Sequence, residues 1–142
     1  MSNKKLGFNE LKVGMKLPEG KIDPITRMQL VDYASASGDY NLLHYDESFA
    51  KKAGLKGCIA HGMLQMAMCA SYIMNWAKNG TLKKFKLRFS DIVNENDVLT
   101  FKGKIINKYQ ESNENLIEVR VLTETQEKRI TSQGSVIISF ST

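Results

Sequence analysis

GMLQMAMCASYIMNWA, residues 62–77, is the stretch of this sequence that decides the fold. Its apolar residues fall on almost every side of a helix, with only Gln65, Ser71 and Asn75 interrupting them. A helix without a polar face is normally buried, because it has no side that favours water. The same polar residues argue against a membrane span. The sequence therefore predicts one long buried helix, closed by Asn79-Gly80.

The residues after this helix change to the alternating pattern of β-strands. Apolar residues alternate with basic ones over residues 85–89, which predicts a half-buried strand. Gly134 marks a bulge or a close approach within a later strand. The polar stretches 94–97 and 109–115 are predicted to be hairpin loops. Three further strands are predicted, over residues 98–107, 116–123 and 129–140.

The residues before the long helix supply shorter elements. Residues 15–25 contain two prolines and are predicted to hold a short edge strand. Thr26 and Gln29 fit a capping box at the start of a helix that ends at Gly38. Asp46 is the expected N-cap of a second short helix. Together these elements predict one α+β domain over residues 1–142, in which a curled antiparallel sheet wraps the apolar helix.

Composition narrows the class of protein. A chain of 142 residues suits one domain with its own core, and no segment resembles a secretion signal. Cys58 and Cys69 lack metal-ligand spacing and are expected to be reduced core residues. The net charge of +5 has two explanations, a lysine-rich solvated surface or the binding of an acidic or phosphorylated partner. The basic cluster at residues 83–88 is compatible with both. We expect a cytoplasmic protein without nucleic-acid or membrane partners.

Two short stretches carry the candidate chemistry. Asp39 and His44 are five residues apart, a spacing that a helix does not bring to one face. A loop containing Gly38 and Asn41 would allow both side chains to point into one cleft. A helix that begins at Gly62 would offer free backbone N–H groups and the positive end of its dipole. A carboxylate, an imidazole and an oxyanion site are the parts needed to move protons next to a carbonyl.

Each of these residues also has a purely structural explanation. Asp39 could serve only as a turn residue, and Asn41 could hold the loop rather than orient His44. His61 could be catalytic or a helix-entry histidine bonded to the backbone. The sequence contains neither the glycine motifs of nucleotide-binding loops nor a Gly-x-Ser-x-Gly nucleophile, which excludes sites of those kinds.

The two stretches together resemble a known family. Residues 37–47, SGDYNLLHYDE, followed by Phe49-Ala50, resemble the hydratase motif of MaoC-like (R)-specific enoyl-CoA hydratases and (3R)-hydroxyacyl dehydratases. Residues 59–64, IAHGML, are similar to the second signature of that family. The likeness covers about residues 8–140 and is strongest to the fatty-acid-elongation dehydratases of mycobacteria. Leu42 stands where the family usually has proline, which leaves the Asp-to-His spacing intact.

The resemblance implies a hotdog fold, a bent antiparallel sheet around one long helix. It implies Asp39 and His44 as the catalytic pair and the Gly62 N–H as the oxyanion donor. We expect Asn41 and His61 to be supporting residues. The expected reaction is the reversible hydration of a trans-2-enoyl thioester of CoA or acyl carrier protein to the (3R)-3-hydroxyacyl thioester. No metal and no other cofactor is expected.

Two alternatives stay open at this point. The same fold would suit a hotdog acyl-CoA thioesterase, which attacks the thioester carbonyl with water. The second alternative is a non-catalytic partner subunit that shapes an acyl tunnel. The resemblance also implies a dimer, which an exposed sheet edge makes physically reasonable. We expect a symmetric homodimer, with Lys or Arg at each mouth for the carrier's phosphates, and a heterodimer with a related hotdog chain as the alternative.

Overall fold

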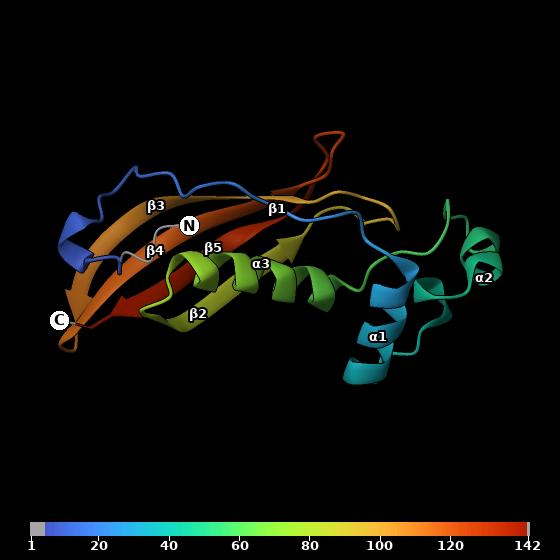
Figure 1. Cartoon of the computed structure of the whole chain (residues 1–142), viewed down its shortest axis with the longest axis horizontal. Helices are drawn as coiled ribbons and strands as arrows, with labels where there is room; N and C mark the ends of the chain where they lie inside the picture. The colour runs from blue at the N-terminus through green and yellow to red at the C-terminus, as the bar shows by residue number, and fades with distance from the viewer. Residues whose placement is uncertain (1–4, 142) are drawn as a thin grey trace.

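A curled sheet of five antiparallel strands forms one layer of the structure, and helix α3 (Gly62–Trp76) lies along its inner side (Figure 1). The computed structural model describes residues 5–141. The strand order is β1-β3-β4-β5-β2. This arrangement of one long helix against a bent antiparallel sheet is the one that the sequence predicts. The strands are β1 (Gly20–Lys21), β2 (Gly80–Phe89), β3 (Thr100–Glu111), β4 (Glu114–Glu124) and β5 (Ile130–Phe140).

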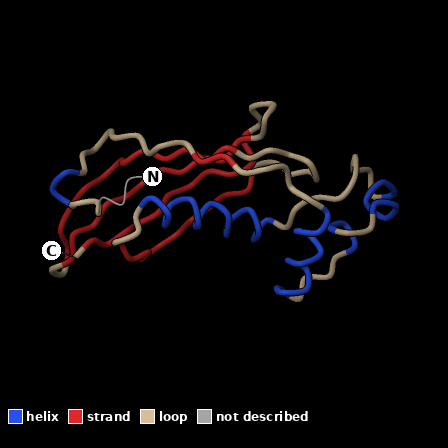
Figure 2. The backbone as a smooth tube through the Cα atoms, in the orientation of Figure 1, coloured by secondary structure: helices blue, strands red, loops and turns tan. Residues whose placement is uncertain are grey.

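The helices between β1 and α3 gather beyond one end of the sheet (Figures 1 and 2). The predicted capping box is present, because the Thr26 side chain accepts from the Gln29 N–H and the Gln29 side chain accepts from the Thr26 N–H. Gly38 ends the first helix in the left-handed region, at φ 77°. Asp46 caps the second helix, as predicted. The elements are α1 (Arg27–Ser37), the 3-10 turn η2 (Leu42–His44) and α2 (Glu47–Lys52), with a further 3-10 turn η1 (Phe8–Glu10) near the start.

The core lies between α3 and the inner face of the sheet. Cys69 and Ile73 of the helix are fully buried there, against apolar residues of the three longest strands. Gln65, also buried on this face, accepts a hydrogen bond of 2.6 Å from the Thr131 hydroxyl of β5. A polar residue of the predicted helix is therefore accommodated by a partner on the sheet. The strand residues of this core include Phe101, Ile105, Val119, Val121, Val136 and Ile138.

The expectation that α3 is apolar on almost every side, and therefore buried, is met in the single chain only on the side that faces the sheet. The buried residues of α3 recur at every fourth position, whereas the opposite side is open to solvent and Met63 is 58% exposed. The physical reason is that this curled sheet covers only one side of the helix. The side of α3 left without cover in the single chain carries the apolar Met63 and Ala67 and the polar Ser71 and Asn75.

The prediction of a hairpin loop at residues 94–97 is also wrong. Strand β2 pairs with β5, whereas β3 pairs with β1 and β4, so the chain between β2 and β3 crosses the sheet. The turn composition of the segment does not reveal which strands pair. The other predicted hairpin joins β3 to β4 through a tighter turn, with Ser112 and Asn113 at positive φ. Gly134 confirms the predicted close approach, since a Cβ there would collide with the backbone of Lys86.

Strand β2 forms one edge of the sheet and has a neighbour on one side only. Leu82 and Phe89 on this strand are 38% and 43% exposed, so the strand is more open than the half-buried one that was predicted. A long, partly apolar edge is a surface to which another strand would bind. Within residues 5–141, none of the helices has the length and apolar character needed to cross a membrane.

Candidate active site

Successive side-chain caps shape the loop that follows α1. The Ser37 hydroxyl accepts from the Asp39 N–H at 3.2 Å, and Asp39 Oδ1 accepts from the Asn41 N–H at 3.2 Å. The Asn41 side chain in turn accepts from the Leu43 N–H at 3.1 Å and caps η2. Asn41 therefore holds the loop, which is the structural role considered for it. These turns set His44 at the end of η2.

Asp39 and His44 lie side by side in this loop. His44 is buried, and its Nδ1–H donates to the Ile59 carbonyl oxygen at 2.8 Å. A carbonyl can only accept, so in the neutral imidazole the lone pair is on Nε2. This Nε2 is 3.8 Å from Oδ2 of Asp39, whose side chain is 54% exposed. The pair is therefore a base with a free lone pair next to an accessible carboxylate.

His61 contacts both members of this pair. Its ring stacks on that of His44, with centroids 3.6 Å apart and an interplanar angle of 22°, and the edge of Tyr33 packs against it. His61 Nε2 is 3.2 Å from the backbone oxygen of Asp39, to which it donates. Burial lowers the pKa of His61 below its ordinary value of 6.5; the bond to the Asp39 backbone opposes this and the nearby His44 adds to it.

Gly62 begins α3 directly after His61. His61 is the N-cap of the helix but makes no side-chain hydrogen bond to it, and the Gly62 N–H has no protein acceptor among residues 5–141. The N-terminus of α3 thus offers a free donor and a positive dipole end next to the two imidazoles. An anionic oxygen would be stabilised there.

The three side chains could also be considered as metal ligands. Asp39, His44 and His61 present donor atoms that all lie within 4.8 Å of one another. The two imidazoles, however, are stacked and nearly parallel, so their in-plane lone pairs do not converge on one ion. His61 also uses Nε2 as a donor to a carbonyl. The arrangement fits acid–base chemistry better than it fits a metal centre.

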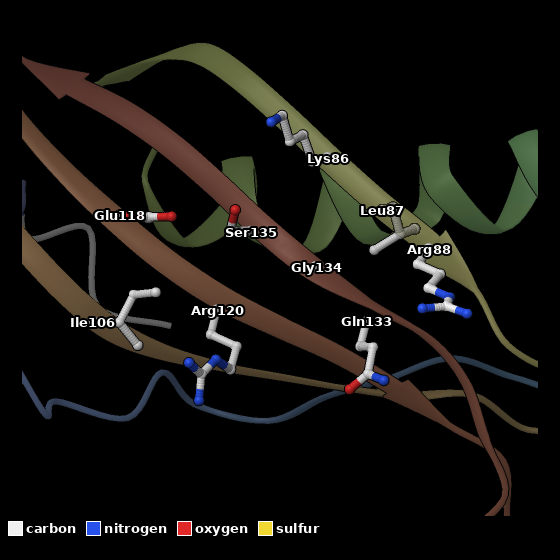
Figure 3. A pocket seen from close by; sticks show the side chains of 9 residues that line it. All are labelled: Lys86, Leu87, Arg88, Ile106, Glu118, Arg120, Gln133, Gly134 and Ser135. Atoms are coloured by element: carbon white, nitrogen blue, oxygen red, sulfur yellow. The ribbon is translucent and has the colours of Figure 1, made fainter.

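The other candidates from the sequence are core or surface residues. Cys58 and Cys69 are buried and unpaired, and burial raises the pKa of Cys69 to about 12, as expected for core thiols. Lys83 pairs with Glu114 at 2.7 Å. Lys86 and Arg88 line a shallow hollow with Arg120, on the side of the sheet that faces away from α3 (Figure 3). This part of the basic cluster is a solvent-facing surface, without ion pairs to the rest of residues 5–141.

Two residues that contact the site are not among the site residues predicted from the sequence. Tyr33 contributes its ring edge to His61 from α1, and Phe89 packs beside Gly62 from the end of β2. The alternation that predicts β2 includes Phe89, but only the crossing of α3 over the sheet brings it to residue 62. No local signal marks Tyr33, because apolar periodicity predicts burial rather than a particular neighbour.

Comparison with known proteins identifies the family of this chain. The family model of the MaoC-like domain matches residues 9–128. The chain therefore belongs to the MaoC-like domain family.

Individual relatives give more detail. The R-hydratase PhaJ1 from Pseudomonas aeruginosa, in its unliganded form, superimposes with a TM-score of 0.85 and 25% identity, over 95% of this chain and 86% of that one. This likeness confirms the hotdog fold. The peroxisomal hydratase-dehydrogenase-epimerase of Neurospora crassa is 30% identical over 110 residues, 75% of this chain and 12% of that protein. The mitochondrial 3-hydroxyacyl-[acyl-carrier-protein] dehydratase of Arabidopsis thaliana is 40% identical over 58 residues, 41% of this chain and 34% of that protein. The chain thus spans about a third or less of these two curated relatives.

Proposed function

We propose that this chain is a hydratase/dehydratase that interconverts trans-2-enoyl and (3R)-3-hydroxyacyl thioesters. The observation that carries the proposal is the pairing of Asp39 with the free Nε2 of His44, beside the uncapped start of α3. Membership of the MaoC-like family supports the reaction class. The (R) stereochemistry is supported by the structural likeness to a protein described as an R-hydratase.

In this proposal the thioester carbonyl lies over the start of α3 and accepts from the Gly62 N–H. The N–H stabilises the enolate-like charge that develops when the α-carbon gains or loses a proton. In dehydration His44 takes the α-proton at Nε2, and the pair then passes one proton to the 3-hydroxyl group held by Asp39, so that the hydroxyl leaves as water and the pair returns to its starting state. In hydration the pair binds one water, removes a proton from it and delivers a proton to the α-carbon. Asp39 and His44 exchange these protons as one unit.

Asn41 and His61 are supporting residues in this scheme. Asn41 keeps η2 in the conformation that presents His44. No step requires a metal or a redox group, because the substrate supplies a carbonyl that already acidifies the α-proton. The acyl group is carried by CoA or by an acyl carrier protein, and the names of the relatives include both hydratases and an acyl-carrier-protein dehydratase.

A thioesterase and a non-catalytic partner subunit are the competing functions, and one assay separates all three. Purified protein is mixed with crotonyl-CoA, and the enoyl absorbance and free thiol are followed together. Loss of absorbance without thiol supports the hydratase, and chiral analysis of the product should give the (3R) isomer. Release of thiol would identify a thioesterase. An inactive protein that gains activity when a related hotdog chain is added would identify a partner subunit.

We further infer a symmetric homodimer, in which a second copy covers the bare side of α3 and the free edge of β2. Support comes from the exposure of Met63 and Phe89, which lie on those two elements near residue 62. The half-exposed Asp39 side chain would then face a tunnel built by both chains. A heterodimer with a related chain is the alternative, and light scattering of the purified chain distinguishes a dimer from a monomer. A single MaoC-like domain over residues 1–142 and a cytoplasmic location stay predictions.

A further inference from the structure

We propose that His61 is a positioning residue in its neutral form. Its ring fixes the orientation of the His44 imidazole by stacking, and its N–H fixes the position of Asp39 through a hydrogen bond to the Asp39 backbone. The inference rests on the proposed function, because it concerns the same pair of residues. His61 belongs to a different segment from the pair, so its two contacts connect the start of α3 to the loop that carries Asp39 and His44.

The first contact holds Asp39. The carboxylate is 54% exposed, and the contacts that restrain this residue run largely through its backbone. Its N–H donates to Ser37, and its carbonyl oxygen accepts from His61 Nε2 at 3.2 Å. The His61 bond is the one that connects the Asp39 backbone to α3. Without it, Asp39 itself would be held only by its turn bonds to Ser37 and Asn41, since the bonds from this loop to Ile59 are made further along, at Leu43 and His44.

The second contact holds the ring of His44. The single bond from Nδ1–H to the Ile59 carbonyl fixes one point of the imidazole but leaves the ring free to tilt about that bond. The His61 ring, with centroids 3.6 Å apart, packs on one face and removes this freedom. The Nε2 lone pair is then held toward Asp39, 3.8 Å away. Small displacements of such groups cost rate, because proton transfer depends steeply on geometry.

The surroundings of its two ring nitrogens favour a neutral His61. Nε2 must carry the hydrogen that it donates to a carbonyl, so the second nitrogen, Nδ1, is unprotonated in the neutral ring. Nδ1 is buried and has no hydrogen-bond partner in the described part of the chain. A proton there would bury an unpaired charge beside His44, which itself gains a proton during the reaction. Asp39, His44 and Tyr33 are the titratable groups that face the ring, and burial lowers the pKa of His61, in agreement with the neutral form.

Two variants separate the contacts. His61→Phe retains a ring for stacking and removes the donor, whereas His61→Gln retains an N–H donor and removes the stack. We expect each to lower kcat on crotonyl-CoA by about 10- to 100-fold, with KM changed less than about threefold. Tyr72→Phe is the matched control. It also removes one hydrogen bond from α3 to a backbone carbonyl, the 2.8 Å bond from the Tyr72 hydroxyl to Pro18, but at a position away from Asp39 and His44. Its kcat should remain that of the wild type.

The decisive measurement is non-additivity. If the His61 ring acts through His44, then adding His61→Gln, which removes the stack but retains the donor to Asp39, to His44→Gln should reduce the residual rate by less than about twofold. An additive loss would overturn the proposal, and so would a loss in His61→Phe as large as that in His44→Ala, because His61 would then be catalytic itself. Wild-type kcat in both single variants would overturn it as well.

A spectroscopic readout keeps this inference separate from the proposed function. Nitrogen NMR of the wild-type protein near pH 7 should find His61 as the neutral Nε2–H tautomer and His44 as the Nδ1–H tautomer. His61→Gln, which removes the stack, should leave His44 as a mixture of tautomers, whereas His61→Phe should keep the wild-type His44 signal, and both melting temperatures should follow that of Tyr72→Phe. A protonated His61, or an unchanged His44 signal in His61→Gln, would contradict the positioning role even if the protein proved inactive on every thioester.

Discussion

The ring of Phe89 occupies the space beside Gly62 where a side chain on that residue would stand. A Cβ built on Gly62 would come within 3.1 Å of the Phe89 ring, which is closer than ordinary van der Waals contact. Glycine at position 62 therefore has two separate explanations, the packing of Phe89 and the N–H that we propose for the thioester oxygen.

Proline at residue 62 separates these explanations. Proline is well tolerated as the first residue of a helix and lacks the N–H. The residue before a proline must be extended, and His61 already is, at φ −59° and ψ 139°. In a Phe89→Leu background, which provides space, Gly62→Pro should lower kcat about 100- to 1000-fold, the cost of one oxyanion donor. Gly62→Ala in the same background keeps the N–H and should remain within about tenfold of the Phe89→Leu rate. Equal rates in the two double variants would remove the Gly62 N–H from the mechanism.

The catalytic pair gives the most direct prediction. Asp39→Asn and His44→Ala should each lower turnover of crotonyl-CoA by at least about 100-fold, because positioned acid–base groups contribute about 10²- to 10⁴-fold. Circular dichroism should find both variants folded, since Asp39 is half exposed and η2 lies outside the main core. A folded variant of either kind with a near-normal rate would mean that the site is assigned to the wrong residues.

The assembly prediction concerns the bare side of α3 and the edge of β2. Met63→Lys and Leu82→Lys each place a charge on an exposed apolar position of these elements, 58% and 38% exposed in the single chain. We expect each to weaken dimerisation at least about tenfold in sedimentation, or about 1.4 kcal/mol. Val13→Lys is the control, on a position that is 60% exposed and lies outside both elements. Equal dimer affinity in all three variants would argue that the interface lies elsewhere.

The lowered pKa of His61 predicts a pH dependence of stability. The unfolded chain takes up a proton at His61 near pH 6.5, whereas the folded protein takes it up only at a lower pH. The free energy of unfolding should therefore fall as the pH drops below 6.5, until the folded pKa is reached. His61→Phe lacks this contribution, so its stability difference between pH 7.5 and pH 5 should be smaller than that of the wild type. Urea denaturation at the two pH values measures it, and a larger difference in His61→Phe would contradict a neutral His61.

The bond between Gln65 and Thr131 predicts an effect on stability alone. Thr131→Val removes the donor of the 2.6 Å bond and leaves the buried Gln65 carbonyl without it. We expect a loss of about 1–3 kcal/mol in urea denaturation, the usual cost of a buried polar group without a partner. The double variant with Gln65→Leu should be closer to the wild type, because neither partner then remains. A fully additive loss in the double variant would mean that the bond does not couple the two positions.

Local patterns in the sequence were sufficient for much of the fold. Thr26 with Gln29, Gly38 and Asp46 mark helix ends, because capping depends on neighbours within four residues. The apolar helix and the alternating strands follow from periodicity in the same way. The two motifs around Asp39 and Gly62 were enough to predict the family.

The tertiary structure alone decided how these pieces meet. The crossing from β2 to β3, the bare side of α3 and the approach of Phe89 to Gly62 all depend on which strands pair and how far the sheet curls. The contacts of His61 are of this kind too, since it lies 22 residues from Asp39, whose backbone it holds. Strand order and ring stacking depend on contacts between residues far apart in the sequence. Local propensity does not specify these contacts, because a strand can bury a similar set of apolar side chains against several different partner strands.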